Sequence, residues 1–583
     1  MARSVPAPGE APLPAPDAAE LLRRNARSVE FGERPAICFG DSVWTHAQYA
    51  AESIRWANLL LSQPRRGGGD AHRPVHVGVL LDNTPDYLFA FGGAAFAGAT
   101  VVGLNPTRVG EHLLRDIVHT DVDLIVTEPR HLGELDGLDL GERRVLVSHR
   151  FDAGSDDVDD RGRDLDAALA EVGSDDPGLA HDPSSTRWAL IFTSGTSGAP
   201  KAVICSQRRL LVTGARMVAM MGLGPDDVGY VAMPLFHSNA VMVGWMPSLV
   251  AGASVGLARR FSVSGFLPDV RRYSATWFNY TGKPLSYLLG SPAQPDDADN
   301  SLRVAFGNEG SPAVLEQFAE RFGVKVIDAF GSTEGAVSLD RDVPPRVGAM
   351  GVAGATISIV DADECECPPA EFDDDGRLTN AERCVGEIVN MAGAGPFEGY
   401  YNNDEATGKA TRNGWYWSGD LGYLDADRYL FFAGRTAEWI RVDGENFPAG
   451  PIGEAIAAHP DVVVAAAYGV PDALAGDQVM VAVVLRSGCA FDPQAFAAWV
   501  DNAGIGGKWR PRYVRVADEL PTTGTNKIVT RTLASQKFRL DRVGGDQLWV
   551  RERGEPYRRF GEAEEDALRR SLVDVGRERF WDL

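Results

Sequence analysis

The sequence predicts an α/β protein with a large N-terminal domain of helix-covered, mostly parallel sheets and a smaller α+β C-terminal domain. Three observations predict this class. Short apolar runs alternate with helical segments at a spacing typical of parallel strands joined by crossover helices. After Arg435 the composition restarts as a compact unit of helices and strands. A chain of 583 residues is also long enough to bury more than one core.

In the first half, continuous apolar runs bounded by polar residues or proline mark the strands. The run from Val75 to Leu81, for example, lies between Pro74 and Asp82, as expected of a buried strand. The stretch 18–63 predicts a helix, a strand at 36–39 and a second helix from about Thr45. The other predicted strands are 100–104, 124–127, 228–233 and 324–329, and the other helices are 84–96, 108–119 and one opened by Ser311-Pro312.

The chain divides into five predicted parts. They are a flexible Pro/Ala-rich lead (1–30), the large domain (31–433), a hinge (434–438), the small domain (439–540) and a C-terminal extension (541–583). The small domain is predicted to hold helices 451–459 and 493–502 and strands 462–469 and 479–485. Two polar stretches, 152–182 and 361–385, predict a solvated connector and an acidic surface insertion. The segment 562–573 predicts an amphipathic helix that docks either on the body of the protein or on a second subunit, which leaves a homodimer open.

Composition excludes some classes of partner. The chain has 57 basic and 81 acidic residues, a net charge of −24, which argues against nucleic acid because a phosphate backbone needs a basic surface. The lead has no apolar h-region, and the apolar run 87–104 predicts a buried helix followed by a strand. We therefore expect no transmembrane segment, while peripheral contact with a membrane stays open. Cys365-Glu366-Cys367 is too tightly spaced for a zinc knuckle, so a reduced, cytoplasmic protein is the simpler interpretation.

The stretch around which the rest is organised runs from Ala189 to Val203. An apolar strand leads into TSGTSGAPK and then into a second apolar run. Glycines let backbone N–H groups turn inward to form an anion-binding concavity, and a lysine brings a compact positive charge to phosphate. A surface turn is the ordinary alternative, but a turn needs no lysine clamped between two strands. The predicted phosphate-binding residues are Thr193, Ser194, Gly195, Thr196, Ser197, Gly198 and Lys201.

Several further motifs follow in order. Phe330-Gly331-Ser332-Thr333-Glu334 comes directly after a buried strand, at the edge where open α/β sheets bind ligands. Asp420 follows a glycine turn, and a carboxylate there can accept both hydroxyls of a ribose. The remaining motifs are Phe236-His237, Gly307-Asn308-Glu309-Gly310, Gly434-Arg435 and the stretch Pro521–Ile528, which contains Lys527.

Together these motifs resemble the adenylate-forming superfamily of acyl-CoA synthetases, luciferases and peptide-synthetase adenylation domains. The resemblance runs from about residue 30 to 535, with five motifs in family order. It implies the adenylate-forming fold, in which a mobile C-terminal domain rotates about the hinge between two half-reactions. ATP, Mg²⁺ and coenzyme A are the cofactor and co-substrates that it implies.

The resemblance also implies roles for particular residues. Thr333 would contact the α-phosphate, and Glu334 would hold Mg²⁺ together with Thr196. Asp420 and Arg435 would reach the ribose, and Lys527 would bridge the substrate carboxylate and the α-phosphate. The nucleotide-binding set further includes Gly307, Asn308, Glu309, Asp328, Phe330, Gly331 and Ser332.

The resemblance assigns one position to the substrate acid and one to CoA. His237 resembles the histidine beside the reacting carboxylate, although a buried structural histidine is the favoured alternative to acid–base catalysis. The segment 435–446 resembles the fatty-acid-transport and very-long-chain branch, where Gly444 would lie against the pantetheine arm. At the hinge, Ala437 replaces the commoner Asp or Lys.

The predicted activity is ATP-dependent ligation of a hydrophobic acid to CoA through an acyl-adenylate. The segments 233–241 and 283–287 resemble actinobacterial fatty-acid and steroid-side-chain CoA ligases, so either acid fits. The acyl pocket is expected from segments 237–245 and 278–310, with Trp245, Trp277 and Tyr280 as candidates that core packing explains equally well. An acyl-AMP ligase serving a carrier protein, a luciferase-type oxygenase and a non-catalytic lipid-uptake protein stay open.

Overall fold

The computed structural model describes residues 13–581 with gaps. The positions left out within that span are 65–72, 152–161, 194–200, 309, 311, 338, 341–345, 347–348, 374–377, 436–438, 443–444, 473–475, 504, 506, 508, 524–527, 553 and 575–580.

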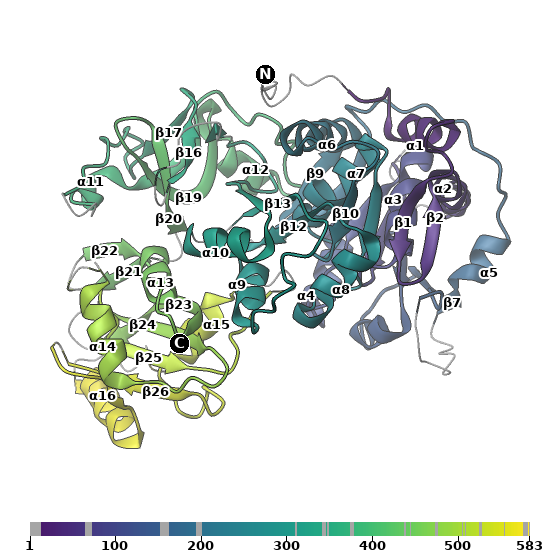
Figure 1. Ribbon diagram of the computed structural model, residues 1–583. Helices are drawn as coiled ribbons and strands as arrows, with labels where there is room; N and C mark the ends of the chain where they lie inside the picture. The colour runs from purple at the N-terminus through teal and green to yellow at the C-terminus, as the bar shows by residue number, and fades with distance from the viewer. Residues whose placement is uncertain are drawn as a thin grey trace.

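Two seven-stranded, mostly parallel sheets form the body of the protein (Figure 1). In the first parallel sheet only β2 runs antiparallel to its neighbour, and in the second only β9 does. The first contains, in spatial order, β14 (Lys325–Asp328), β13 (Val304–Asn308), β12 (Trp277–Thr281), β10 (Val228–Val231), β11 (Ser254–Leu257), β1 (Pro35–Phe39) and β2 (Ser42–Thr45). The second contains β7 (Arg163–Asp164), β6 (Arg144–Val147), β5 (Leu124–Thr127), β3 (His76–Leu80), β4 (Thr100–Gly103), β8 (Arg187–Thr193) and β9 (Lys201–Ser206).

Helices cover both sheets, and α3 is buried on nearly every side, from Pro85 to Phe96. Apolar residues all round a helix are expected where it is enclosed by other elements. The run 87–104 is therefore a buried helix followed by strand β4, as predicted. The helices of the body are α1 (Ala18–Arg27), α2 (His46–Leu61), α3 (Pro85–Ala97), α4 (Glu111–His119), η1 (Pro129–Leu135), α5 (Leu165–Ala170), α6 (Gln207–Met221), η2 (Asn239–Trp245), α7 (Met246–Ala251), α8 (Val263–Tyr273), α9 (Gly282–Gly290) and α10 (Pro312–Phe322).

A six-stranded antiparallel sheet follows the two parallel sheets in the chain. The insertion 361–385 lies between β17 and β18 and contains only the short helix α11 among its described residues. The elements of this part are β15 (Leu339–Asp340), β16 (Ala349–Ala353), β17 (Ile357–Val360), α11 (Ala381–Cys384), β18 (Gly386–Asn390), α12 (Asp404–Ala410), η3 (Arg412–Gly414), β19 (Tyr416–Leu424) and β20 (Tyr429–Arg435).

The C-terminal unit has its own seven-stranded sheet. Strands β26 and β27, which lie beyond residue 540, extend this sheet by antiparallel pairing with β25 and with each other. The segment after 540 is thus built into the small domain. Its elements are β21 (Trp439–Val442), β22 (Glu445–Pro448), α13 (Gly450–Ala457), β23 (Val462–Asp472), β24 (Gly476–Leu485), α14 (Pro493–Asn502), β25 (Tyr513–Val516), α15 (Thr530–Gln536), β26 (Gln547–Val550), β27 (Arg558–Arg559) and α16 (Glu562–Asp574).

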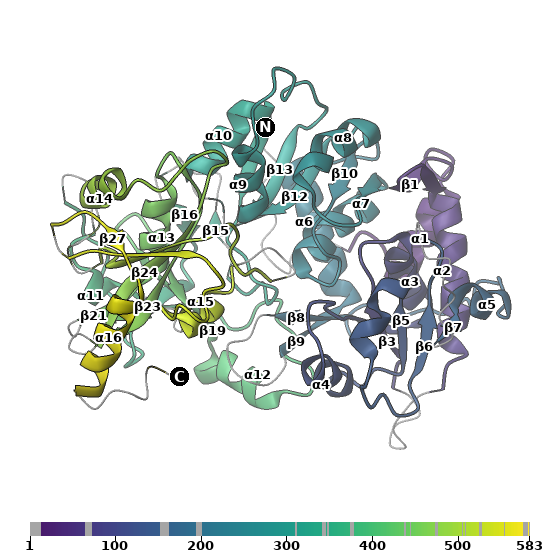
Figure 2. The same cartoon turned by 90° about the horizontal axis from the view of Figure 1, so that it is seen from below.

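The C-terminal unit touches the body at helix α9 (Figures 1 and 2). The guanidinium of Arg486 donates to the carbonyl oxygen of Leu289 at 3.3 Å. Tyr287 packs against the apolar cluster of the small domain, and burial, followed by the nearby Glu519 carboxylate, raises its pKa. These contacts place the chain that leads into the Lys527 segment beside α9.

Helix α1 confirms the helix predicted to begin at residue 18, within a stretch also assigned to the lead: Asp17 caps it by accepting from the Glu20 amide at 2.7 Å, and Leu21 and Leu22 are buried. One element appears where polar sequence predicted none. Helix α5 lies within the predicted connector and buries Leu165 and Leu169. Among the described residues, no helix has the length and apolar content needed to cross a membrane.

Candidate active site

The segment before and after the predicted phosphate loop forms a hairpin. Thr193 ends β8 and pairs with Lys201, which begins β9, so the loop is closed by an antiparallel pair as the two apolar runs predicted. The loop residues themselves lie outside the described part of the chain: Ser194, Gly195, Thr196, Ser197 and Gly198.

Tyr400 links the phosphate hairpin to the predicted metal carboxylate. Its segment pairs with β9, where the Tyr401 amide donates to the Ala202 carbonyl oxygen at 2.8 Å. The Lys201 ammonium lies 5.5 Å from the centroid of the Tyr400 ring, and the Tyr400 hydroxyl donates to Glu334 Oε1 at 2.7 Å. One aromatic ring therefore holds both predicted residues, which are far apart in sequence.

The turn after β14 carries Thr333 and is fixed from two sides. The Arg209 guanidinium, from α6, donates to the carbonyl oxygen of Thr333. The hydroxyls of Ser238 and Thr333 are 2.8 Å apart, so the segment after His237 reaches this turn. Glu334, the next residue, is only 7% exposed. Burial, followed by this carboxylate, raises the pKa of Tyr400, which keeps the phenol protonated and donating.

The predicted ribose residues lie opposite each other. Asp420, on β19, pairs with Arg435, the last residue of β20. Asp420 is 8% exposed, and the Ser418 hydroxyl accepts from its amide at 3.0 Å. The antiparallel ladder thus brings the backbones of the two residues opposite each other.

Tyr416, at the start of β19, joins the Asp420 strand to the Thr333 turn. It is 1% exposed. Burial raises its pKa most, followed by the Glu334 and Tyr400 groups and, more weakly, by Asp420, while a hydrogen bond with Ser332 lowers it. The carboxylates of Glu334 and Asp420 both therefore lie near enough to Tyr416 to raise its pKa.

The predicted adenine residues lie at the carboxyl ends of neighbouring parallel strands. Gly307, on β13, pairs with Asp328, which ends β14. Asp328 Oδ2 accepts from the Tyr280 hydroxyl at 2.9 Å and from the Gly310 amide at 3.0 Å. Asn308 ends β13, and Glu309 lies outside the described residues. The carboxyl-end edge of a parallel sheet is the usual ligand edge of such folds.

The aromatic residue of the turn, Phe330, is half-buried, and its ring centroid lies 6.3 Å from that of Phe432 on β20. Gly331 and Ser332 continue the exposed part of the turn. A Cβ at Gly331 would meet nothing within 4 Å, so this glycine leaves open space beside the turn.

His237 lies in the turn between β10 and η2. Its amide donates to the Pro234 carbonyl oxygen at 3.0 Å, and its ring centroid lies 4.4 Å from that of Phe236. The turn is held against β4, because a Cβ on Gly103 would lie 2.9 Å from the Phe236 Cα. The following η2 is a π-helix, a form frequent at functional sites.

Of the three aromatic residues predicted as candidates for the acyl pocket, Trp245 and Tyr280 make other contacts that account for their positions. Trp245 packs among core rings, with centroids 4.8 Å from Phe91 and 5.6 Å from Trp188. Tyr280 supports Asp328 through its hydroxyl. Trp277 belongs to an apolar cluster of methionines and aromatics between α6 and the first parallel sheet.

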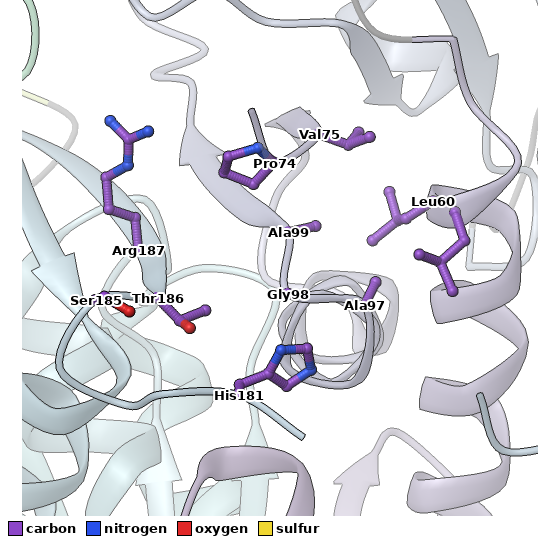
Figure 3. A pocket seen from close by; sticks show the side chains of 11 residues that line it. Leu60, Pro74, Val75, Ala97, Gly98, Ala99, His181, Ser185, Thr186 and Arg187 are labelled. Carbon is purple, nitrogen blue, oxygen red and sulfur yellow. The ribbon is translucent and has the colours of Figure 1, made fainter. Parts of the chain in front are cut away.

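Two cavities lie elsewhere. One of about 300 Å³ lies between the ends of α2 and α3 and is lined by His181 and Arg187, among others (Figure 3). Arg187 begins β8, whose other end enters the phosphate loop six residues later, roughly 20 Å away. A second cavity, of about 550 Å³, lies beside α8 and α9. Neither cavity coincides with the site that the motifs define.

Lys527 and Gly444 lie outside the described residues, as do hinge positions 436–438 with Ala437. The flanks of the Lys527 loop are described: Thr522 and Ile528 form a β-bridge, and the Val529 amide donates to the Pro521 carbonyl oxygen at 2.8 Å. This bridge therefore joins the two ends of the segment that contains Lys527 in the sequence.

Sequence reasoning missed the residues that hold the motifs together. Tyr400 and Arg209 stand in no motif singled out above, and Ser238 and Tyr416 lie within or beside such motifs but were given no role of their own. The nearest sequence signal is position: Ser238 follows His237, and Tyr416 lies four residues before Asp420.

Gly307→Ala is expected to destabilise the protein by roughly 1–3 kcal/mol, because overpacking forces backbone shifts of that cost. The added Cβ would lie 2.3 Å from the Tyr280 carbonyl oxygen, which belongs to backbone and cannot rotate away. The measurement is the midpoint of urea unfolding. Gly133→Ala, where a Cβ meets nothing within 4 Å, serves as the control; equal midpoints for the two variants would contradict the expectation.

Two sheets of parallel strands whose carboxyl ends gather hydroxyls, carboxylates and a lysine define a nucleotide-binding α/β enzyme with a separate small domain. The chain matches the AMP-binding enzyme family over residues 22–401 and the AMP-binding enzyme C-terminal domain over residues 452–527. It therefore belongs to the AMP-binding enzyme family.

Similar proteins agree with this assignment. The chain is 46% identical over 549 residues to the steroid-22-oyl-CoA synthetase of Rhodococcus jostii (strain RHA1), covering 92% of this chain and 94% of that one. It is 42% identical over 523 residues to the medium/long-chain-fatty-acid–CoA ligase FadD17 of Mycobacterium marinum, covering 89% and 96%.

Solved structures share the fold. The anthranilate CoA ligase AuaEII, in complex with anthranoyl-AMP, superposes with a TM-score of 0.75 at 21% identity, covering 90% of this chain and 98% of that chain. ATP-bound MatB from Rhodopseudomonas palustris gives 0.73 at 22% identity, covering 89% and 98%. The predicted large and small domains of the adenylate-forming fold are thereby confirmed.

Proposed function

We propose that the protein is an AMP-forming acyl-CoA ligase that activates a hydrophobic carboxylic acid, either a fatty acid or a steroid side-chain acid. The convergence of Lys201, Glu334 and Asp420 on two buried tyrosines carries the proposal, because it gathers a cation, a carboxylate and a ribose acceptor from three separate segments. The activities of the two relatives support the acid and the thiol acceptor.

The residues would divide the work of adenylation. Thr333 and Lys201 would bind phosphate oxygens, and Asp420 with Arg435 would fix the ribose. Lys527 would bridge the substrate carboxylate and the α-phosphate, which offsets charge as two anions approach. His237, adjacent to Ser238 at the Thr333 turn, would stand beside the acid.

The site also fits Mg²⁺, whose ligands are oxygen atoms. Glu334 is a buried carboxylate oriented by the Tyr400 hydroxyl, and Thr196 would add a hydroxyl. When bound, the ion would neutralise phosphate charge.

For the second step we propose that the small domain turns about residues 434–438 and that Gly444 lies against the pantetheine arm of CoA. One site would then serve two reactions in succession. We further propose a cytoplasmic location, in keeping with six cysteines that form no disulfide.

The test is pyrophosphate release from ATP, measured with and without CoA across fatty, aromatic and steroidal carboxylates. Thioester formation with fatty or steroidal acids is the expected result. An adenylate that accumulates unchanged when CoA is added would instead indicate a ligase that serves a carrier protein. Absence of pyrophosphate release with every acid would indicate a non-catalytic acyl-binding protein.

Tyr400→Phe is expected to lower kcat/KM for MgATP by about tenfold or more, since a hydrogen bond to a charged group contributes about 1.5–3 kcal/mol. The change removes only the hydroxyl that donates to Glu334 and keeps the ring under Lys201. Steady-state pyrophosphate assays measure it. The control is Tyr401→Phe, which removes a hydroxyl that donates to Asp121 and not to Glu334. Its kcat/KM for MgATP should fall less than that of Tyr400→Phe.

A further inference from the structure

One face of α6 leads away from the Thr333 turn. Arg209, Thr213, Arg216 and Met220 are spaced at i, i+4, i+7 and i+11, so they share this face. Arg209 anchors the face by donating to the Thr333 carbonyl oxygen. Arg216 lies seven residues further on, about 10 Å along the helix axis.

An apolar cluster fills the space between this part of α6 and the first parallel sheet. Ala329, the residue before Phe330, packs against it at one end. Methionine is the most deformable apolar side chain, so such a cluster can rearrange around an apolar ligand. Its buried members are Met217, Met221, Leu223, Trp277, Val304 and Phe306. An acyl chain that starts at the nucleotide turn would therefore run along α6.

Arg216 is a cation without a partner at the edge of this apolar region. Its side chain is half-buried and its Nε is fully buried, yet it makes no hydrogen bond or ion pair with any residue that the structure describes. Burial lowers its pKa. The buried Trp277 Nε1, in the cluster itself, is a second donor without a partner in the described chain.

Buried donors left without acceptors are rare, because each costs about 1–3 kcal/mol. Arg216 Nε and Trp277 Nε1 have no acceptor among the described residues, so a bound molecule is a natural source of one. A guanidinium in an apolar surrounding favours an oxygen acceptor above all.

We propose that Arg216 is a specificity-determining residue that donates to an oxygen atom at the far end of the acyl group, roughly 10 Å from the reacting carboxylate. The preferred substrates are then acids whose apolar body ends in a ketone, hydroxyl or carboxylate oxygen. The inference rests on the proposed function and narrows its substrate class.

The test compares kcat/KM for decanoic acid, its keto acid with the ketone at the penultimate carbon and its terminal dicarboxylic acid, and for a steroid side-chain acid with and without its ring hydroxyl. The full-length wild type is expected to prefer the oxygen-bearing acid of a pair at least tenfold, because a site built to hydrogen-bond an oxygen rejects the analogue that lacks it. Preference for the dicarboxylic acid alone would identify a charged partner, and preference for the keto or hydroxy acid a neutral one.

Arg216→Met is expected to reduce this preference about tenfold or more, and Arg216→Lys should restore part of it. Arg260→Met, which removes an exposed arginine, is the matched control and should keep the wild-type ratio. A wild type that activates both members of each pair equally would overturn the inference while leaving the ligase activity intact. A wild type that activates no acid would overturn the proposed function instead.

Discussion

Lys527→Ala is expected to reduce acyl-adenylate formation by roughly 10²–10³-fold, the usual cost of removing one charge-stabilising donor from a transition state. The β-bridge between Thr522 and Ile528 does not involve the Lys527 side chain, so truncation of that side chain leaves the bridge in place. Single-turnover formation of labelled adenylate from ATP and the acid measures the effect directly.

A matched control is Lys409→Ala, which removes an exposed lysine paired with Glu405 on helix α12. It should retain the wild-type rate. Thioester formation from a synthetic acyl-adenylate and CoA should fall much less in Lys527→Ala than adenylation does. Equal losses in both half-reactions would show that Lys527 does not act on the α-phosphate step alone.

Glu334→Gln is expected to lower the adenylation rate by about 10²–10³-fold, because the carboxylate would supply charge to Mg²⁺ that an amide cannot. Since the carboxylate is buried and held by Tyr400, the amide can keep the same position. Adenylation should then need a higher Mg²⁺ concentration, measured by titration of MgCl₂ at saturating ATP.

The control for this variant is Glu405→Gln, at a carboxylate exposed on α12. Its Mg²⁺ titration should match that of the wild type. A Glu334→Gln enzyme with a reduced rate but an unchanged Mg²⁺ midpoint would assign Glu334 to positioning of the turn and not to the metal.

Much of the fold could be predicted because buried parallel strands leave a strong signal. Leu124–Thr127 is a strand with the predicted bounds, since it is a continuous apolar run buried on both faces. Helix α5 could not be found in this way. It has only six residues, and its stability comes from the burial of Leu165 and Leu169 against distant elements.

The candidate site could likewise be predicted only in part from the sequence. Motifs located Glu334 and Asp420, because glycine turns and carboxylates at strand ends are local signals. Tyr400 and Arg209 carry no local signal, because their role depends on partners 66 and 124 residues away, and only the packed structure shows those partners. The helices predicted from residue 18 and over 562–573 are present as α1 and α16, whereas β26 was not predicted, because it is short and gains stability from the strand that it joins.

The ring of Tyr400 also bears on what happens between catalytic cycles. A lysine and a glutamate this close would ordinarily collapse into a salt bridge once the substrates have left, and each new round would begin by breaking it. Here the cation lies over the face of the ring and the carboxylate is held at its hydroxyl, and no ion pair joins Lys201 to Glu334 in the described structure. The phenol thus lies between the two charged groups and contacts both of them.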